Sequence, residues 1–250
     1  MLRWLARELR PTSAAELSKA LSLPMTTTVR ALSTLEAAGY AERFQTSNRY
    51  VLGKAARTLA FGFLAQFPIR DLAMPYLQRL TLETGFTSSL FVRLGWYAVR
   101  VAVVLGQTMI LHRTPTGEAR ELVAGAPAKA MLAFLPDEEV AAVIARSGLD
   151  APREAALRAE LREIRKAGFV LGASQSDATA LDFAAPLFDN KGRAIGAIAI
   201  EEAAGSSETA LVKPGGAARQ IIDELASRIR DESTVAMSHY DHVDPDAIEL

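Results

Sequence analysis

Hydroxyl side chains and an arginine stand close together just after Pro24, as Thr26, Thr27, Thr28 and Arg30. Threonine hydroxyls hydrogen-bond to phosphate oxygens and base edges, and an arginine donates two hydrogen bonds to the major-groove edge of guanine. On the outer face of an exposed helix these groups would contact a nucleic acid. The alternative is a local role, with Thr26 as the N-cap of the helix that follows.

The elements predicted around this segment form a winged helix-turn-helix. Ser13 and Glu16 have the spacing of a capping box at the start of the second helix, and Gly39 stands where the third helix should end. The predicted elements are helices over 1–9, 14–21 and 26–38 and short strands over 40–44 and 49–52. In such a unit the last helix of the pair enters the major groove with its N-terminus first.

Charge is distributed unevenly along the 250 residues. Residues 1–60 hold nine basic and four acidic side chains, residues 61–230 hold 19 of each sign, and residues 231–250 hold six acids and no lysine or arginine. A basic head on a neutral body favours binding to a polyanion, although a solvated basic surface or a protein-binding helix-turn-helix is the alternative. We therefore predict DNA contacts from Ser13, Thr26, Thr27, Thr28, Arg30, Arg43 and Arg49.

Composition excludes several other classes. There is no cysteine, there are only three histidines, and no apolar stretch approaches the roughly 18 residues of a membrane span. Charged residues within the first ten positions exclude a signal peptide. We expect a cytoplasmic protein without membrane association, cofactor or metal, and Asp/His clustering in the acidic tail is more typical of a flexible end than of a metal site.

The body after residue 53 predicts an α+β domain with an antiparallel sheet. Strands are predicted over 88–94, 97–104, 108–112, 169–171, 183–188 and 193–200, and helices over 54–67, 69–84, 127–135, 137–145, 155–167 and 214–230. The expected organisation is a DNA-binding domain over 1–53, a linker helix over 54–67, an effector-binding and oligomerisation domain over 68–230 and a flexible tail over 231–250.

Several segments, taken in order, resemble the IclR-type bacterial transcriptional regulators. They are Leu23–Leu32 with the sequence LPMTTTVRAL, Leu35–Arg43, Arg49–Gly53, Ala128–Leu135, Gly168–Val170, Ala184–Asp189 and Gly192–Ile195. The resemblance implies a DNA-binding regulator with a GAF/PAS-like effector domain whose pocket lies between sheet and helices. It also implies a dimer or dimer of dimers that reads an inverted-repeat operator.

The resemblance places the effector site at Gly125, Ala126, Gly172, Asp182, Ala199 and Glu201. Here the sequence departs from the family: Pro127 lacks an amide hydrogen where the family binds small oxo-acids, and Asp182 and Glu201 replace a cysteine and a serine. We hypothesise that these two acids bind a cationic or polyhydroxyl effector. The alternative is that they are solvated or paired with a nearby arginine.

Two other functions stay open. One is an architectural DNA-binding protein whose body only oligomerises. The other is a GAF-like small-molecule enzyme, which is disfavoured because the sequence contains no nucleophile elbow, dinucleotide fingerprint or phosphate loop. We therefore expect no enzymatic activity and a regulator, repressor or activator, controlled by a metabolite.

Overall fold

The computed structural model describes residues 1–8, 10–44, 47–106, 116–173, 181–202 and 216–232. These residues form two compact units, one up to Gln66 and the other from Phe67 onward. We call them the N-terminal unit and the C-terminal unit. Within the described ranges, no helix has both the length and the apolar character that crossing a membrane requires.

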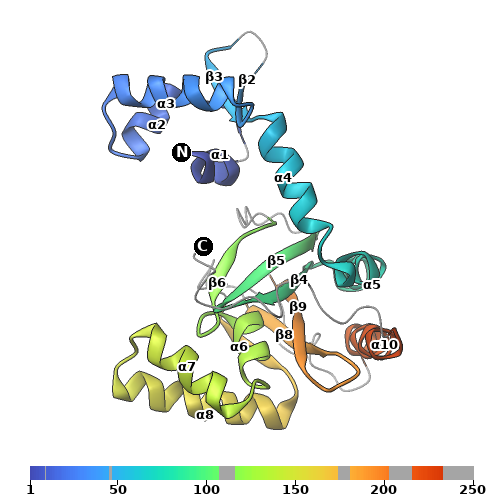
Figure 1. The fold of residues 1–250 in the computed structure, drawn as a ribbon. Helices are drawn as coiled ribbons and strands as arrows, with labels where there is room; N and C mark the ends of the chain where they lie inside the picture. The colour runs from blue at the N-terminus through green and yellow to red at the C-terminus, as the bar shows by residue number, and fades with distance from the viewer. Residues whose placement is uncertain (9, 45–46, 107–115, 174–180, 203–215, 233–250) are drawn as a thin grey trace. The chain divides into compact units, whose positions relative to one another are not determined.

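The N-terminal unit is a winged helix-turn-helix, as predicted (Figure 1). Its elements are α1 (Leu2–Glu8), β1 (Thr12–Ser13), α2 (Ala14–Ala20), α3 (Met25–Ala37), β2 (Ala41–Arg43), β3 (Arg49–Leu52) and α4 (Lys54–Leu64). The strands form an antiparallel sheet in the order β1-β3-β2. A small core of Leu5, Leu17, Leu32, Ala41 and Tyr50 holds the helices on this sheet.

Local sequence explains how the two central helices begin. Ser13 and Glu16 form the predicted capping box, in which each side chain accepts a hydrogen bond from the other residue's backbone N–H. The prediction that Thr26 caps α3 is wrong. Pro24 is the N-cap, because its extended backbone (φ −57°, ψ 142°) precedes the helix and its carbonyl accepts the N–H of Thr28.

Gly53 fixes the join between the wing and α4. A Cβ at this position would lie 2.2 Å from the carbonyl oxygen of Gly39, so only glycine fits. The first turns of α4 are also held to the wing, since Arg57 donates to both carboxylate oxygens of Glu42.

The C-terminal unit is an α+β domain with a six-stranded antiparallel sheet in the order β6-β5-β4-β9-β8-β7, which confirms the predicted fold class (Figure 1). The strands are β4 (Thr87–Leu94), β5 (Tyr97–Val104), β6 (Ala119–Glu121), β7 (Val170–Ala173), β8 (Leu181–Phe188) and β9 (Ala194–Glu202). The helices are α5 (Pro68–Thr84), α6 (Ala126–Leu132), α7 (Asp137–Ser147), α8 (Ala151–Ala167) and α10 (Ala217–Asp231).

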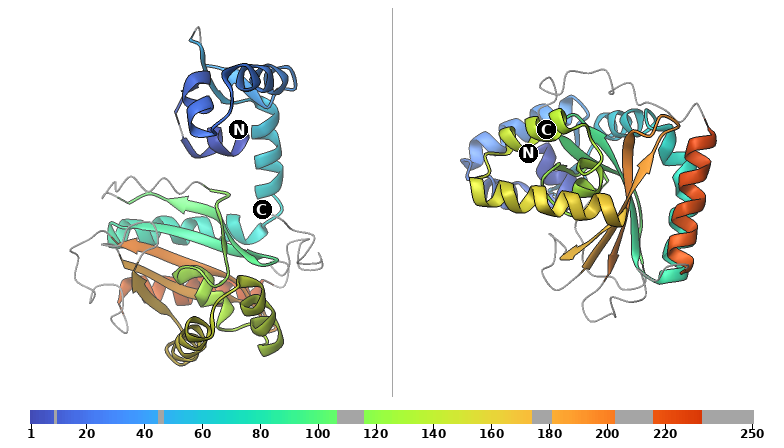
Figure 2. Two further views of the ribbon diagram at one scale, coloured as in Figure 1. Left: turned by 90° about the vertical axis from the view of Figure 1, so that its left-hand side faces the viewer. Right: turned by 90° about the horizontal axis from the view of Figure 1, so that it is seen from below.

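Helices cover both faces of this sheet. Figure 2 shows α5 and α10 on one face and α6, α7 and α8 on the other. The second face carries an apolar cluster to which the central strands contribute Phe91, Ala184, Ala197 and Ala199. Side chains that share this face therefore lie between the sheet and α6.

Some elements of the structure differ from those predicted from the sequence. The predicted strand over 108–112 lies outside the described residues, and the short edge strand β6 was not predicted. A turn at Gly95–Trp96 joins β4 to β5, with Leu94 opposite Tyr97. Helix α8 begins at Ala151 rather than 155, because the Asp150 side chain caps it by accepting the N–H of Arg153.

Candidate DNA-binding surface and effector site

The outer face of α3 presents the polar side chains that were singled out for DNA contact. Thr26, Thr27 and Arg30 are all exposed. The opposite side of the helix is fixed in the unit by Thr28 and Leu32, both fully buried. Within the described part of the N-terminal unit, α3 packs against α2 and β2 (Figure 1), and its first two turns leave these polar side chains exposed.

Thr28 does not belong to this outer face. Its side chain is 0% exposed, and its hydroxyl donates to the carbonyl oxygen of Pro24 over 3.1 Å. Helical periodicity accounts for this, since position 28 precedes Leu32 by four residues and shares its inward side. We therefore withdraw Thr28 from the predicted DNA contacts and treat it as a packing residue.

The other residues predicted to contact DNA form hydrogen bonds or ion pairs within the N-terminal unit. Arg49 donates to the Pro11 carbonyl over 2.9 Å and to the Glu16 carboxylate over 3.1 Å, so it connects the wing to α2. The Ser13 hydroxyl is engaged in the capping box. Hydrogen bonds to the Glu16 carboxylate, from the backbone N–H of Ser13 first and the Arg10 side chain second, lower the pKa of Glu16 to about 2.

Arg43 lies at the wing, with half of its side chain exposed. It pairs with Glu36 at 3.2 Å, and its guanidinium lies 5.6 Å from the ring centre of Tyr50. A partly exposed arginine held in this way keeps donors available for a phosphate.

All four acids of this unit form ion pairs with arginines that do not lie on the outer face of α3. These arginines are Arg10, Arg43, Arg49 and Arg57. Among the described residues, no acidic side chain pairs with Arg30. The positive charge of Arg30 on the outer face of α3 is therefore not neutralised by any acid in the described part of the chain. This arrangement favours approach of a polyanion to α3.

In the C-terminal unit, four of the predicted effector residues share one face of the sheet. Asp182 lies directly opposite Glu201 on the neighbouring strand and directly opposite Gly172 on the other side. Ala199 precedes Glu201 by two residues and therefore points to the same side. Since Ala199 belongs to the apolar cluster under α6, this is the α6 face.

The other two predicted residues open α6. Gly125 is its N-cap, with φ +80°, a conformation that side chains rarely adopt. Ala126, the first residue of the helix, is 4% exposed and joins the same apolar cluster. The six predicted effector residues thus lie on the α6 face or at the helix that covers it.

A buried ion pair on this face was missed by the sequence reasoning. Arg100 on β5 donates to Glu201, and the two residues are 2% and 6% exposed. Burial lowers the pKa of the Arg100 guanidinium, while Glu201 opposes that shift. A signal was present in the sequence, because Arg100 is the one charged residue of an otherwise apolar strand and needs a partner when buried.

This pair corrects the premise of the effector hypothesis. Glu201 is not an uncompensated acid, since Arg100 neutralises it. A second guanidinium, that of Arg120, lies 5.2 Å from the ring of Phe91, and Arg100 lies 5.0 Å from the same ring. Arg120 is itself paired with Glu118 at 3.4 Å, and a bare cation at Glu201 would have to compete with Arg100.

Buried polar atoms on this face have hydrogen-bonding capacity to spare. Within the described part of the chain, the Ser89 hydroxyl, the Arg120 Nε and the Glu201 Oε2 contact no hydrogen-bond partner. Ser89 lies opposite Ala199, and Glu201 lies two residues further along the same strand. Buried polar groups are normally satisfied, so these donor and acceptor atoms are candidates for hydrogen bonds to a ligand.

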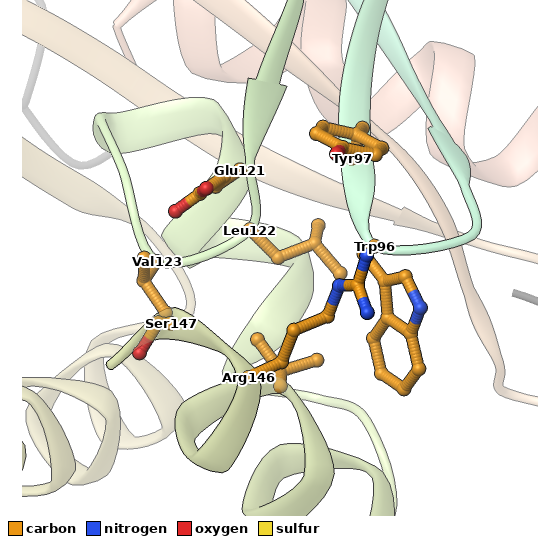
Figure 3. Close-up of a pocket in the computed structure, with 8 residues that line it drawn as sticks. Trp96, Tyr97, Glu121, Leu122, Val123, Arg146 and Ser147 are labelled. Carbon is orange, nitrogen blue, oxygen red and sulfur yellow. The ribbon is translucent and has the colours of Figure 1, made fainter. Parts of the chain in front are cut away.

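A separate open hollow lies between the β5–β6 edge and α7. Its walls include Trp96, Glu121 and Arg146, and the Arg146 guanidinium lies 5.8 Å from the Trp96 ring centre (Figure 3). None of the six predicted effector residues lines it. Among the described residues, no group of three potential metal ligands occurs. The tail histidines, and the tail acids after Glu232, lie outside that range.

Comparison with known proteins agrees with this architecture. Residues 1–43 match the family model for the IclR helix-turn-helix domain, and residues 61–211 match that for the bacterial transcriptional regulator IclR C-terminal domain. The chain is 27% identical over 210 residues to the HTH-type transcriptional repressor AllR of Klebsiella pneumoniae, covering 80% of this chain and 76% of that protein.

Solved structures show the same fold. The Thermotoga maritima IclR has a TM-score of 0.71 at 22% identity, with 93% of this chain and 95% of that one covered. An IclR homologue from Microbacterium hydrocarbonoxydans, complexed with 4-hydroxybenzoate, has a TM-score of 0.68 at 19% identity, with 93% and 98% covered. The matches to both family models, together with this fold, show that the chain belongs to the IclR family of bacterial transcriptional regulators.

Proposed function

We propose that this protein is a transcriptional repressor that binds a specific DNA operator through α3 and responds to a small metabolite. The observation that carries the DNA-binding part is the exposed face of Thr26, Thr27 and Arg30, whose arginine has no acidic partner among the described residues. The name repressor follows the AllR relatives. The protein acts in the cytoplasm in this proposal, where its DNA is.

We further propose that two copies bind an inverted repeat through a symmetric dimer. One α3 reads only a few base pairs, so a second head is needed for a specific site. Helix α4 supports this assignment, because none of its residues is buried and it exposes Leu59 (61%) and Phe61 (71%). A second copy of α4 is the occupant that would cover these side chains.

The DNA-binding proposal is tested by selecting duplexes from a random pool with the full chain and measuring Kd by fluorescence anisotropy. We expect a defined inverted repeat and a Kd that rises steeply with salt. Arg30→Ala should relax the preference at one base position, at a cost of about 1–3 kcal/mol. Arg153→Ala, an equally charged change on a 77%-exposed side chain of α8, should not. Failure to select any duplex would reject the proposal.

For the metabolite we propose the α6 face of the sheet and a neutral polyhydroxyl compound. The spare donors and acceptors of Ser89, Arg120 and Glu201 support a ligand of this kind, and a simple cation at Glu201 is disfavoured because Arg100 already pairs with that acid. The ligand-bound homologue shows only that a relative was obtained with a small aromatic acid.

A thermal-shift screen of polyols, amines and simple carboxylic acids tests the ligand class. A ligand at one hundred times its Kd should stabilise the protein by about 2.7 kcal/mol. Ser89→Ala and Asp182→Asn should weaken that effect, whereas Ser147→Ala, in the separate hollow, should not. A carboxylic acid that stabilises all variants equally would reject this ligand class. A ligand series that never changes operator affinity would favour an architectural protein without an effector.

A further inference from the structure

Two large apolar side chains stand on the outside of α3, where solvation should disfavour them. Met25 is 48% exposed and Val29 is 42% exposed, while the core side of the same helix is filled by Thr28 and Leu32. Residues four apart lie next to each other on a helix, so Met25 and Val29 form one continuous surface. We call this pair the apolar patch.

The apolar patch adjoins the polar face proposed to read DNA. Val29 follows Thr26 by three residues and Arg30 follows it by four, so both side chains are neighbours of Thr26 on the helix surface. Met25 and Thr26 are the first two residues of α3, the end that enters a groove first. Any duplex that approaches Thr26 and Arg30 therefore also approaches this patch.

The major groove offers one apolar group that such a surface can recognise, the 5-methyl of thymine. We propose that Met25 and Val29 contact thymine methyl groups next to the guanine read by Arg30, and so determine part of the operator sequence. This inference rests on the proposed DNA-binding function and deepens it. It assigns the patch to DNA rather than to a second protein surface, because the patch shares its helix turns with an unneutralised arginine in a unit whose basic side chains outnumber its acids.

The expected effect of losing one contact is modest and measurable. Burial of one carbon is worth about 0.8 kcal/mol, which corresponds to about a fourfold change in Kd. A symmetric operator carries the same thymine in each half, so removal of both methyls should raise Kd about 15-fold.

The test replaces thymines by uracil, which lacks only the 5-methyl, one symmetric pair at a time in the duplex selected by the full chain. We expect Kd to rise at one or two positions near the guanine that depends on Arg30. With the Val29→Ala variant, replacing the same thymine by uracil should change Kd little further, because the thymine methyl no longer has the valine side chain to contact. Met25→Ala should act likewise at its own position. Leu82→Ala, which shortens an 81%-exposed side chain on α5, should keep the full response to uracil.

The outcomes separate this inference from the function on which it rests. If uracil is tolerated at every position while salt-sensitive, sequence-specific binding persists, the methyl contact is wrong and the DNA-binding function stands. If Val29→Ala changes the sedimentation coefficient but leaves the response to uracil intact, the patch is a protein interface and the inference is overturned. If the full chain selects no duplex, both proposals fall.

Discussion

The buried pair of Arg100 and Glu201 gives the sharpest test of the C-terminal unit. Their side chains are 2% and 5% exposed, so removal of either partner leaves a charge in the interior. Such single removals cost about 3–5 kcal/mol, whereas replacement of both partners by apolar residues is often close to neutral. We therefore expect Arg100→Met and Glu201→Met each to be strongly destabilising and the double variant to be less so than either.

The surroundings predict which single change is worse. Glu201→Met leaves Arg100 with the Phe91 ring at 5.0 Å and the favourable field of Glu118. Arg100→Met leaves Glu201 directly opposite Asp182, two carboxylates without the neutralising guanidinium. Arg100→Met should lie at the upper end of the range. At about 2–4 °C per kcal/mol for a unit of this size, the two changes lower Tm by roughly 6–20 °C.

The chain contains two tryptophans, Trp4 and Trp96, one in each unit. In a Trp4→Phe background, the fluorescence of Trp96 follows unfolding of the C-terminal unit alone. The matched control is Glu163→Met, which breaks an exposed pair with Lys166 whose side chains are 71% and 74% exposed and should cost less than about 1 kcal/mol. If the two core variants melt like this control, the pair does not contribute as a buried interaction and the reasoning is refuted.

Three further results are expected. The pKa of Glu16 falls from 4.5 to about 2 on folding, so its contribution to the stability of the N-terminal unit is present above pH 4.5 and is lost as pH falls toward 2. Glu16→Gln should therefore flatten the dependence of melting on acid pH, measured by Trp4 fluorescence. Gly53→Ala should lower the denaturant midpoint of the N-terminal unit while Gly62→Ala, at a site with open space, does not, because only the first Cβ meets the Gly39 carbonyl. Phe61→Glu should shift sedimentation from dimer to monomer and weaken operator binding, and an unchanged dimer would exclude α4 as the interface.

Features set by neighbouring residues were accessible from sequence. The capping box of Ser13 and Glu16, the third helix before Gly39 and the antiparallel α+β class all depend on short-range spacing or alternation, and the structure contains them. The same reasoning misplaced some helix ends by a few residues. It assigned the N-cap of α3 to Thr26, whereas the N-cap is Pro24. It also placed Thr28 outside, where helical periodicity alone puts it beside Leu32.

Long-range partners needed the tertiary structure. The sequence alone determined that the chain carries a basic helix-turn-helix head and an antiparallel sheet. Both follow from the charge and the periodicity of short segments. It also contained a charged residue in an apolar strand. Only the assembled sheet decided that this arginine meets Glu201, 101 residues away, since the pairing of β5 with β4 and of β4 with β9 brings them onto one face. Burial and partnership depend on elements distant in the chain, so the neutralisation of Glu201 by Arg100 could not be predicted from the local sequence pattern.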